Sequence, residues 1–229
     1  MVYAKWHNLK LNPSEIYRSM GRTSENKDWQ ETMPSIEHVR LTALKLAVPR
    51  FVGVVLPVTA TPKGRIKLAG NLPFHCNQRY FFGASHAVAL IVTVGSRLEQ
   101  ESDRCFREGK YLEGLIFDAC GSVALDEVLG LARQKISQEM VEPGQKLGYT
   151  LSPGCQMIPL EEQATIFSLL DFEAIGVTLT DAYMMIPGKS LSAIIPVGTE
   201  LSLPNDANYA CEVCSRKKEC EYKPEKARN

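Results

Sequence analysis

The sequence predicts an α+β protein with a largely antiparallel, twisted sheet, a long central helix and flanking helices. Three observations lead to this fold class. Helical and strand-like segments alternate irregularly along the 229 residues, and no internal repeat is visible. No glycine-rich turn links a strand to a helix, as a parallel nucleotide-binding sheet would require. The strongest β-branched runs are continuously apolar, which is typical of central strands covered on both faces.

The first helices are expected near the amino terminus. Asn12 is suited to an N-cap and Pro13 to a first helical position, so a short helix should follow and stop at Gly21. Residues 21–32 are polar and are expected to form a loop. A second helix should begin at Pro34 and end near residue 49, because apolar residues recur at helical spacing between them.

The middle of the chain predicts two strands and two helices. Phe51 to Thr59 and Ala87 to Val94 are β-branched and apolar, so both indicate strands. A charged helix should follow over 96–108. After a break at Gly109, a long helix is expected from about Lys110 to Met140.

The last third adds a helix, two strand segments and a tail. The helix is expected over Leu160–Phe172, and the strands over Val177–Ile186 and Leu191–Val197. Val177, Leu179 and Ala182–Ile186 would make a strand pair, with Pro187-Gly188 as the turn. We therefore divide the chain into a domain of residues 1–204 and a cysteine-rich tail of residues 205–229.

Charge and hydropathy exclude several function classes. Twenty-six basic residues balance 26 acidic ones, and no basic stripe interleaved with aromatic residues appears, so nucleic-acid binding has no support. The amino terminus has no apolar core of signal-peptide length, and no segment approaches the roughly 20 apolar residues that span a bilayer. We expect a cytoplasmic protein that does not bind a membrane.

One acidic residue interrupts an apolar side of the long helix. On a helical wheel, that side carries Leu112, Leu115, Ala119, Val123 and Leu129. Asp126 falls in the middle of this stripe, and Ser122 lies one turn before it. A carboxylate carried into a core needs a cation, N–H donors or a bound ligand. Asp126 would therefore face one of two partners. One is a neighbouring backbone amide or basic side chain of the protein, and the other is a bound ligand.

A second candidate feature is the turn Ser152-Pro153-Gly154, followed by Cys155. Proline fixes φ, glycine tolerates positive φ, and serine can bond the backbone ahead of it. Such a turn exposes backbone N–H and C=O groups that a ligand could use. The alternative is that the turn only connects two elements.

Three of the seven cysteines cluster near the carboxyl end, at Cys211, Cys214 and Cys220. The C-x2-C spacing lets one loop chelate a metal or an iron–sulfur cluster, and Cys155 could supply a fourth ligand if the tail folds back. The cysteine cluster allows three interpretations: an iron–sulfur cluster, a structural zinc ion, or free thiols on a flexible tail.

Several segments together resemble a known family. The block from Tyr149 to Ala193 contains SPG, PLEEQ and GVTLTDAYMMIPGKSLSA, and it is similar to the S-adenosylmethionine-binding activation domain of cobalamin-dependent methionine synthase. LKLNPSEIYRSMG resembles the opening helix of that family, and DACGSVALD resembles its long helix. The resemblance covers nearly the whole chain and points to a small free-standing form.

The resemblance implies roles for particular residues. Asp126 occupies the position of an acidic residue that contacts S-adenosylmethionine, and the backbone at Ser152 and Gly154 would hold the methionyl carboxylate. The family places an Arg where this chain has Thr150, and a Tyr where it has Cys155. Loss of that Arg would remove a charge-assisted hydrogen bond worth about 1.5–3 kcal/mol.

The resemblance also implies partners. The chain would cap a corrinoid-binding protein or methyltransferase, which presents cobalamin, and a ferredoxin- or flavodoxin-type donor could supply electrons. Tyr183, Met184 and Met185 would face the corrin ring. An alternative is a docking or chaperone-like partner that carries a structural metal and does not bind S-adenosylmethionine, which Thr150 and Cys155 favour. A zinc-stabilised domain unrelated to cobalamin is a third option.

The cobalamin assignment carries one geometric requirement. Asp126 on the long helix and the proline–glycine bend after it should converge on one cleft. If these two places faced away from each other, with no hollow between them, the assignment would fail.

Overall fold

The structure is a computed structural model that describes residues 2–5, 9–21, 28–61, 65–155 and 158–201. Its centre is a seven-stranded antiparallel sheet. Six strands have the order β4-β3-β2-β5-β9-β6, and β1 pairs with β2. These strands are β1 (Val2–Lys5), β2 (Arg50–Ala60), β3 (Ile66–Leu68), β4 (Leu72–Phe74), β5 (His86–Thr93), β6 (Lys146–Leu147) and β9 (Ser190–Gly198). A small second sheet pairs β7 (Thr178–Leu179) with β8 (Met185–Ile186).

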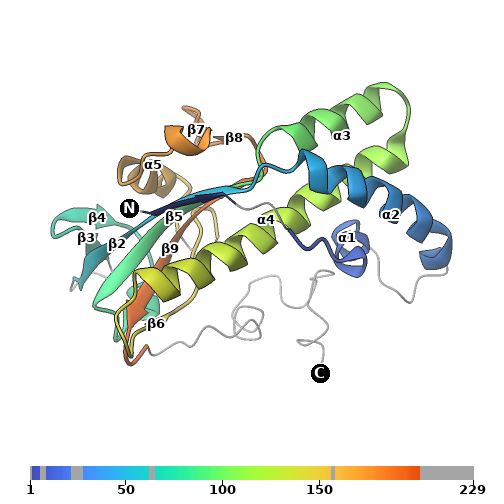
Figure 1. The fold of residues 1–229 in the computed structure, drawn as a ribbon. Coiled ribbons are helices and arrows are strands. Elements are labelled where there is room, and N and C mark those ends of the chain that lie inside the picture. The colour runs from blue at the N-terminus through green and yellow to red at the C-terminus, as the bar shows by residue number, and fades with distance from the viewer. Residues whose placement is uncertain (1, 6–8, 22–27, 62–64, 156–157, 202–229) are drawn as a thin grey trace.

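Helices cover both faces of the large sheet. They are α1 (Pro13–Ser19), α2 (Trp29–Leu46), α3 (Arg97–Arg107), α4 (Tyr111–Glu139) and α5 (Glu162–Ser168), with short 3-10 helices η1 (Gln78–Phe81) and η2 (Glu173–Ile175). In Figure 1, α4 runs obliquely along the sheet and α1, α2 and α3 gather around it, whereas α5 and the β7–β8 hairpin lie on the other side. No helix in the described ranges is both long and apolar enough to cross a membrane.

Strand β5 explains why the core has two parts. Its side chains alternate, so that Val88, Leu90 and Val92 belong to a cluster formed with α1, α2, α3 and α4. The intervening Ala87, Ala89 and Ile91 belong to a second cluster, formed with α5, η1 and η2. Both faces of β5 are therefore buried, and this accounts for its continuously apolar sequence.

The fold class is as predicted, and so are most of the main elements. Strands β2, β5 and β9 and helices α1, α3 and α4 lie where the sequence placed them, within one or two residues. The four strands β1, β3, β4 and β6 were not predicted. Each has two to four residues, so too few side chains alternate to give a pattern.

Helix α2 begins earlier than the sequence predicted. It begins at Trp29, inside the expected loop of residues 21–32, and Pro34 lies within it instead of opening it. The backbone oxygen of Asp28 accepts hydrogen bonds from the amide and the hydroxyl of Thr32, which starts the helix earlier. Proline in the second turn forfeits only one helical hydrogen bond, at an end that faces solvent.

The segment over 177–186 is also different from the prediction. It forms the β7–β8 hairpin, whose turn is closed by the amide of Tyr183 donating to the oxygen of Thr180. Pro187-Gly188 is therefore not the hairpin turn but the connection from β8 to β9. Helix α5 is shorter than the expected helix over 160–172, because Leu169 ends it and η2 follows.

Candidate functional site

Asp126 does not lie in the core. Its side chain is exposed and lines a hollow of about 230 Å³ between α4 and the segment that opens α1. Lys10, Asn12 and Glu15 face it from that segment. The protein atoms around the carboxyl raise its pKa by desolvation, Arg18 lowers it, and Glu15 raises it further. Asp126 thus titrates in a shallow surface hollow, and the interpretation that it interrupts a buried stripe is wrong.

The buried side of α4 consists mainly of small residues. Leu112 and Leu115, which define the predicted stripe, are 45% and 51% exposed. In contrast, Gly121, Ala124 and Val128 are buried. Small side chains let neighbouring elements approach α4 closely. The positions of large apolar residues on the helical wheel therefore do not identify the side of α4 that packs against the rest of the protein.

The predicted turn at 152–154 is present. The amide of Cys155 donates to the oxygen of Ser152 (3.0 Å), and Gly154, with φ +83°, donates to the oxygen of Ile158 (2.9 Å). Pro153 is buried, whereas Gly154 and the thiol-bearing Cys155 are exposed. Glycine is required at this positive φ, and the turn presents its last two residues to solvent.

Arg133 joins this segment to α4. Its guanidinium donates to Thr150 Oγ1 (2.7 Å) and to the oxygen of Gly148 (3.0 Å). The side chain is half-buried, and desolvation lowers its pKa. No carboxylate pairs with it among the described residues. Arg133 was not among the predicted site residues, although a single arginine between the apolar residues Ala132 and Ile136 was a possible signal.

Asp126 and the Ser152–Gly154 turn do not line the same hollow among the described residues. Leu151 and Ile158, which flank the turn, belong to the cluster on the α5 side of the sheet. Helix α4 packs into the cluster on the opposite side. None of the described residues that line the hollow of Asp126 comes from Tyr149–Ala193. This hollow therefore does not show the expected convergence, which stays a prediction, although Arg133 brings α4 into contact with Thr150, two residues before the turn.

The β7–β8 hairpin presents apolar side chains to solvent. Met184 and Ile186 are 61% and 56% exposed, whereas Met185 packs against the second cluster. Tyr183 adopts φ +58°, and its backbone oxygen accepts a hydrogen bond from Gln163 Nε2 of α5 (2.9 Å). Tyr183 is therefore held on the α5 side of the sheet, the same side as the Ser152–Gly154 turn.

A buried acid was also missed, in the PLEEQ segment. Glu162 is 7% exposed, and one of its oxygens bonds His75 Nδ1, a residue 87 positions earlier. Its Oε2 is buried and has no hydrogen-bond partner among the described residues. Burial and the Glu162 charge raise the pKa of the adjacent thiol, Cys76, to about 12. No local pattern in the sequence pairs residues so distant.

The predicted metal ligands are only partly visible. Cys211, Cys214 and Cys220 lie outside the described residues, so their arrangement stays a prediction. Cys155 is an exposed free cysteine. Within the described ranges, no group of three or more His, Cys, Asp or Glu side chains could hold a metal ion.

Comparisons with known proteins identify the fold. No protein-family model and no curated protein matches the sequence. Among solved structures, the chain is similar to the crystal structure of the MetH reactivation domain bound to AdoHcy, with a TM-score of 0.64 and 14% identity. The similarity covers 90% of this chain and 79% of that one. The chain thus has the fold of a reactivation domain of this type.

Proposed function

We propose that this protein is a partner of a corrinoid protein and supports the reductive reactivation and methylation of cobalamin that the partner presents. The observation that carries the proposal is the similarity of fold to the MetH reactivation domain over 90% of the chain. The resemblance of the Tyr149–Ala193 block to that family supports it independently of the coordinates. The corrin would carry the chemistry, and the protein would supply orientation and electrostatics.

We further propose that S-adenosylmethionine binds beside the 148–155 segment, with Arg133 near its carboxylate. The structural neighbour was solved with AdoHcy bound. Arg133 places a guanidinium against Thr150, the position where the family has an arginine. A guanidinium has five N–H donors, so those not used on Thr150 and Gly148 could bind a carboxylate. Asp126 is not part of this proposed site because it lines a separate hollow with Lys10, Asn12 and Glu15.

The test of S-adenosylmethionine binding is calorimetry with the full chain. We expect a saturable signal, and Arg133→Met should weaken it ten- to hundredfold, as loss of one charge-assisted interaction would. Asp126→Asn is the control from the same helix, since it removes a charge from a separate hollow and should leave the affinity unchanged. Absence of any signal for the wild-type chain would refute this part of the proposal.

For the tail, we propose an iron–sulfur cluster ligated by Cys211, Cys214 and Cys220, with Cys155 as the fourth ligand. The C-x2-C spacing and the exposed thiol of Cys155 support it. The cluster would receive electrons from a ferredoxin- or flavodoxin-type donor. Anaerobic purification followed by iron and sulfide analysis tests this proposal, and we expect Cys214→Ser to lose the visible absorbance. One equivalent of zinc without iron would contradict it.

A second candidate function is docking to a corrinoid protein without S-adenosylmethionine. Two observations favour it: Arg133 already has two hydrogen-bond acceptors, and Met184 and Ile186 present an apolar hairpin. This candidate predicts binding to a cobalamin-binding module of methionine synthase that Met184→Glu weakens. Calorimetry with the module should then give the same affinity whether or not S-adenosylmethionine is present.

A further inference from the structure

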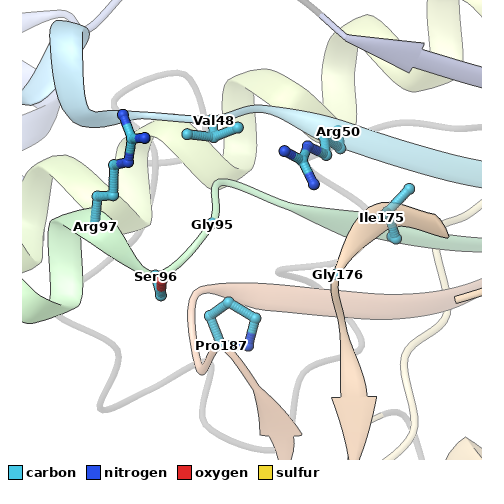
Figure 2. Close-up of a pocket in the computed structure, with 8 residues that line it drawn as sticks. All are labelled: Val48, Arg50, Gly95, Ser96, Arg97, Ile175, Gly176 and Pro187. Carbon is cyan, nitrogen blue, oxygen red and sulfur yellow. The ribbon is translucent and has the colours of Figure 1, made fainter. Parts of the chain in front are cut away.

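A second pocket shares no lining residue with the hollow of Asp126. Its volume is about 220 Å³, and Figure 2 shows that β2, the start of α3, η2 and the β8–β9 connection meet around it. It is lined by Val48, Arg50, Gly95, Ser96, Arg97, Ile175, Gly176 and Pro187. Two arginines are its only charged lining residues among those described.

Arg50, the first residue of β2, is half-buried at this pocket. Its Nε is buried and has no hydrogen-bond partner within the described ranges. A β-carbon added at Gly176 would lie 3.6 Å from Arg50 Nη1, so the backbone of η2 closes over the guanidinium. A buried donor without an acceptor is costly. The guanidinium also carries N–H groups at Nη1 and Nη2, from which an oxyanion in the pocket would accept.

The second arginine begins helix α3. Arg97 is exposed and follows the N-cap residue Ser96, whose side chain makes no capping hydrogen bond. The first amides of an α-helix lack intrahelical acceptors and carry the positive end of the helix dipole. Helix α3 has 11 residues, so these amides belong to a complete helix and add to the positive potential from Arg97 and Arg50.

The nearby acid does not neutralise this potential by pairing with either arginine. Glu99 lies in the first turn of α3, but its Oε1 accepts the amide hydrogen of Lys189. Among the described residues, neither Arg50 nor Arg97 forms a salt bridge. The volume is below the roughly 300–1,000 Å³ of pockets that enclose a whole drug-sized ligand. It is suited to one anionic group and a small part of what carries it.

We propose that this pocket binds a phosphate group, held between Arg50 and Arg97 at the amino end of α3. Guanidinium groups and helix N-termini are the partners that phosphate oxygens commonly take in proteins. A tetrahedral anion has acceptor directions for several donors, such as the two arginines and the helix amides, whereas a planar carboxylate has fewer. The phosphate could be free or an ester of a small molecule.

Calorimetry distinguishes the two sources with two probes, inorganic phosphate and phenyl phosphate, each titrated into the full chain. We expect at least one to bind with a dissociation constant below about 10 mM. Tighter binding of phenyl phosphate would assign the site to a phosphate ester, and tighter binding of inorganic phosphate to the free ion. No binding of either probe would overturn the proposal.

Three variants locate the binding. Arg50→Met should weaken it by about tenfold or more, as loss of a charged hydrogen-bond donor would. Arg107→Met is the matched control, because Arg107 is an exposed arginine at the opposite end of the same helix and should not matter. Equal losses for both variants would mean non-specific charge attraction and would contradict the site.

Ser96→Asp separates loss of binding from loss of folding. An aspartate is a favourable N-cap residue, so the melting temperature should not fall. Its carboxylate would compete with the phosphate for the same amides and arginines, so the affinity should fall about tenfold or more. Unchanged affinity of this folded variant would exclude the amino end of α3 from the binding.

Discussion

At the scale of single residues, two buried thiols should make the stability of the protein depend on pH. One lies in each hydrophobic cluster. Burial raises the pKa of Cys76 and of Cys120 from 9.0 to about 12. For Cys76 the Glu162 charge adds to the rise, whereas for Cys120 Arg40 opposes it. The folded protein therefore retains two protons that the unfolded chain releases in alkaline solution.

Linkage gives the sign of the effect on stability. Each thiol holds its proton more tightly in the folded protein, and this stabilises the fold. The contribution is complete below the pKa of the thiol in the unfolded chain, about 9, and is lost as the pH rises towards 12, the pKa in the folded protein. We expect each thiol to lower the free energy of unfolding by about 2 kcal/mol between pH 8 and about pH 10.5, measured by urea denaturation. The double variant Cys76→Ala/Cys120→Ala is the control, and its stability should fall less over that range. An equal fall in both proteins would contradict the assignment.

Asp126 gives a second prediction at this scale. Because its side chain is exposed, Asp126→Asn should change the free energy of unfolding by less than about 0.5 kcal/mol at neutral pH. A buried acid with satisfied hydrogen bonds, as the helical wheel suggested, would instead give a loss of several kcal/mol. Chemical denaturation of the variant at pH 7 decides between these two environments.

At the scale of the element, glycines of α4 show which of its sides is covered. A β-carbon at Gly130 would meet nothing within 4 Å, so Gly130→Ala should stabilise the protein by about 0.5–1 kcal/mol. A β-carbon at Gly114 would lie 3.0 Å from the ring of Phe106 on α3. The same change there should give no gain, or a loss, because the ring must move.

Thermal denaturation of the two alanine variants measures this difference. The two substitutions are chemically identical and lie in one helix, so helix propensity contributes equally to both. A higher melting temperature for Gly130→Ala than for Gly114→Ala is expected. Equal shifts would mean that Phe106 does not pack against α4 in solution.

At the scale of the whole molecule, the described residues already form two large hydrophobic clusters. Both hydrophobic clusters consist of residues between Leu9 and Val197. A chain of residues 1–204 should therefore unfold cooperatively, with a melting temperature within a few degrees of that of the full chain. If the proposed cluster exists, the same truncation should remove all bound iron.

Circular dichroism and metal analysis of the truncated chain test both statements together. A truncated chain that does not fold would show that the tail stabilises the domain. Iron retained by residues 1–204 would place the cluster ligands elsewhere. Either result would revise the division into a domain of residues 1–204 and a tail of residues 205–229.

The sequence by itself determined the fold class and the elements that form the core. Strands β2, β5 and β9 are long, β-branched and continuously apolar, and α3 and α4 are separated by Gly109, so local chemistry is sufficient to place them. The turn at Ser152–Gly154 was also predictable, because proline and glycine restrict the backbone wherever they occur.

Only the tertiary structure decided which side of each element is covered and which distant residues meet. Asp126 faces solvent because small residues, and not leucines, form the covered side of α4. Arg133 donates a hydrogen bond to Thr150, and Arg50 and Arg97 line one pocket, although the two residues of each pair are far apart in the sequence. Such long-range contacts depend on how the elements pack in three dimensions. The local spacing of residues in the sequence does not predict them.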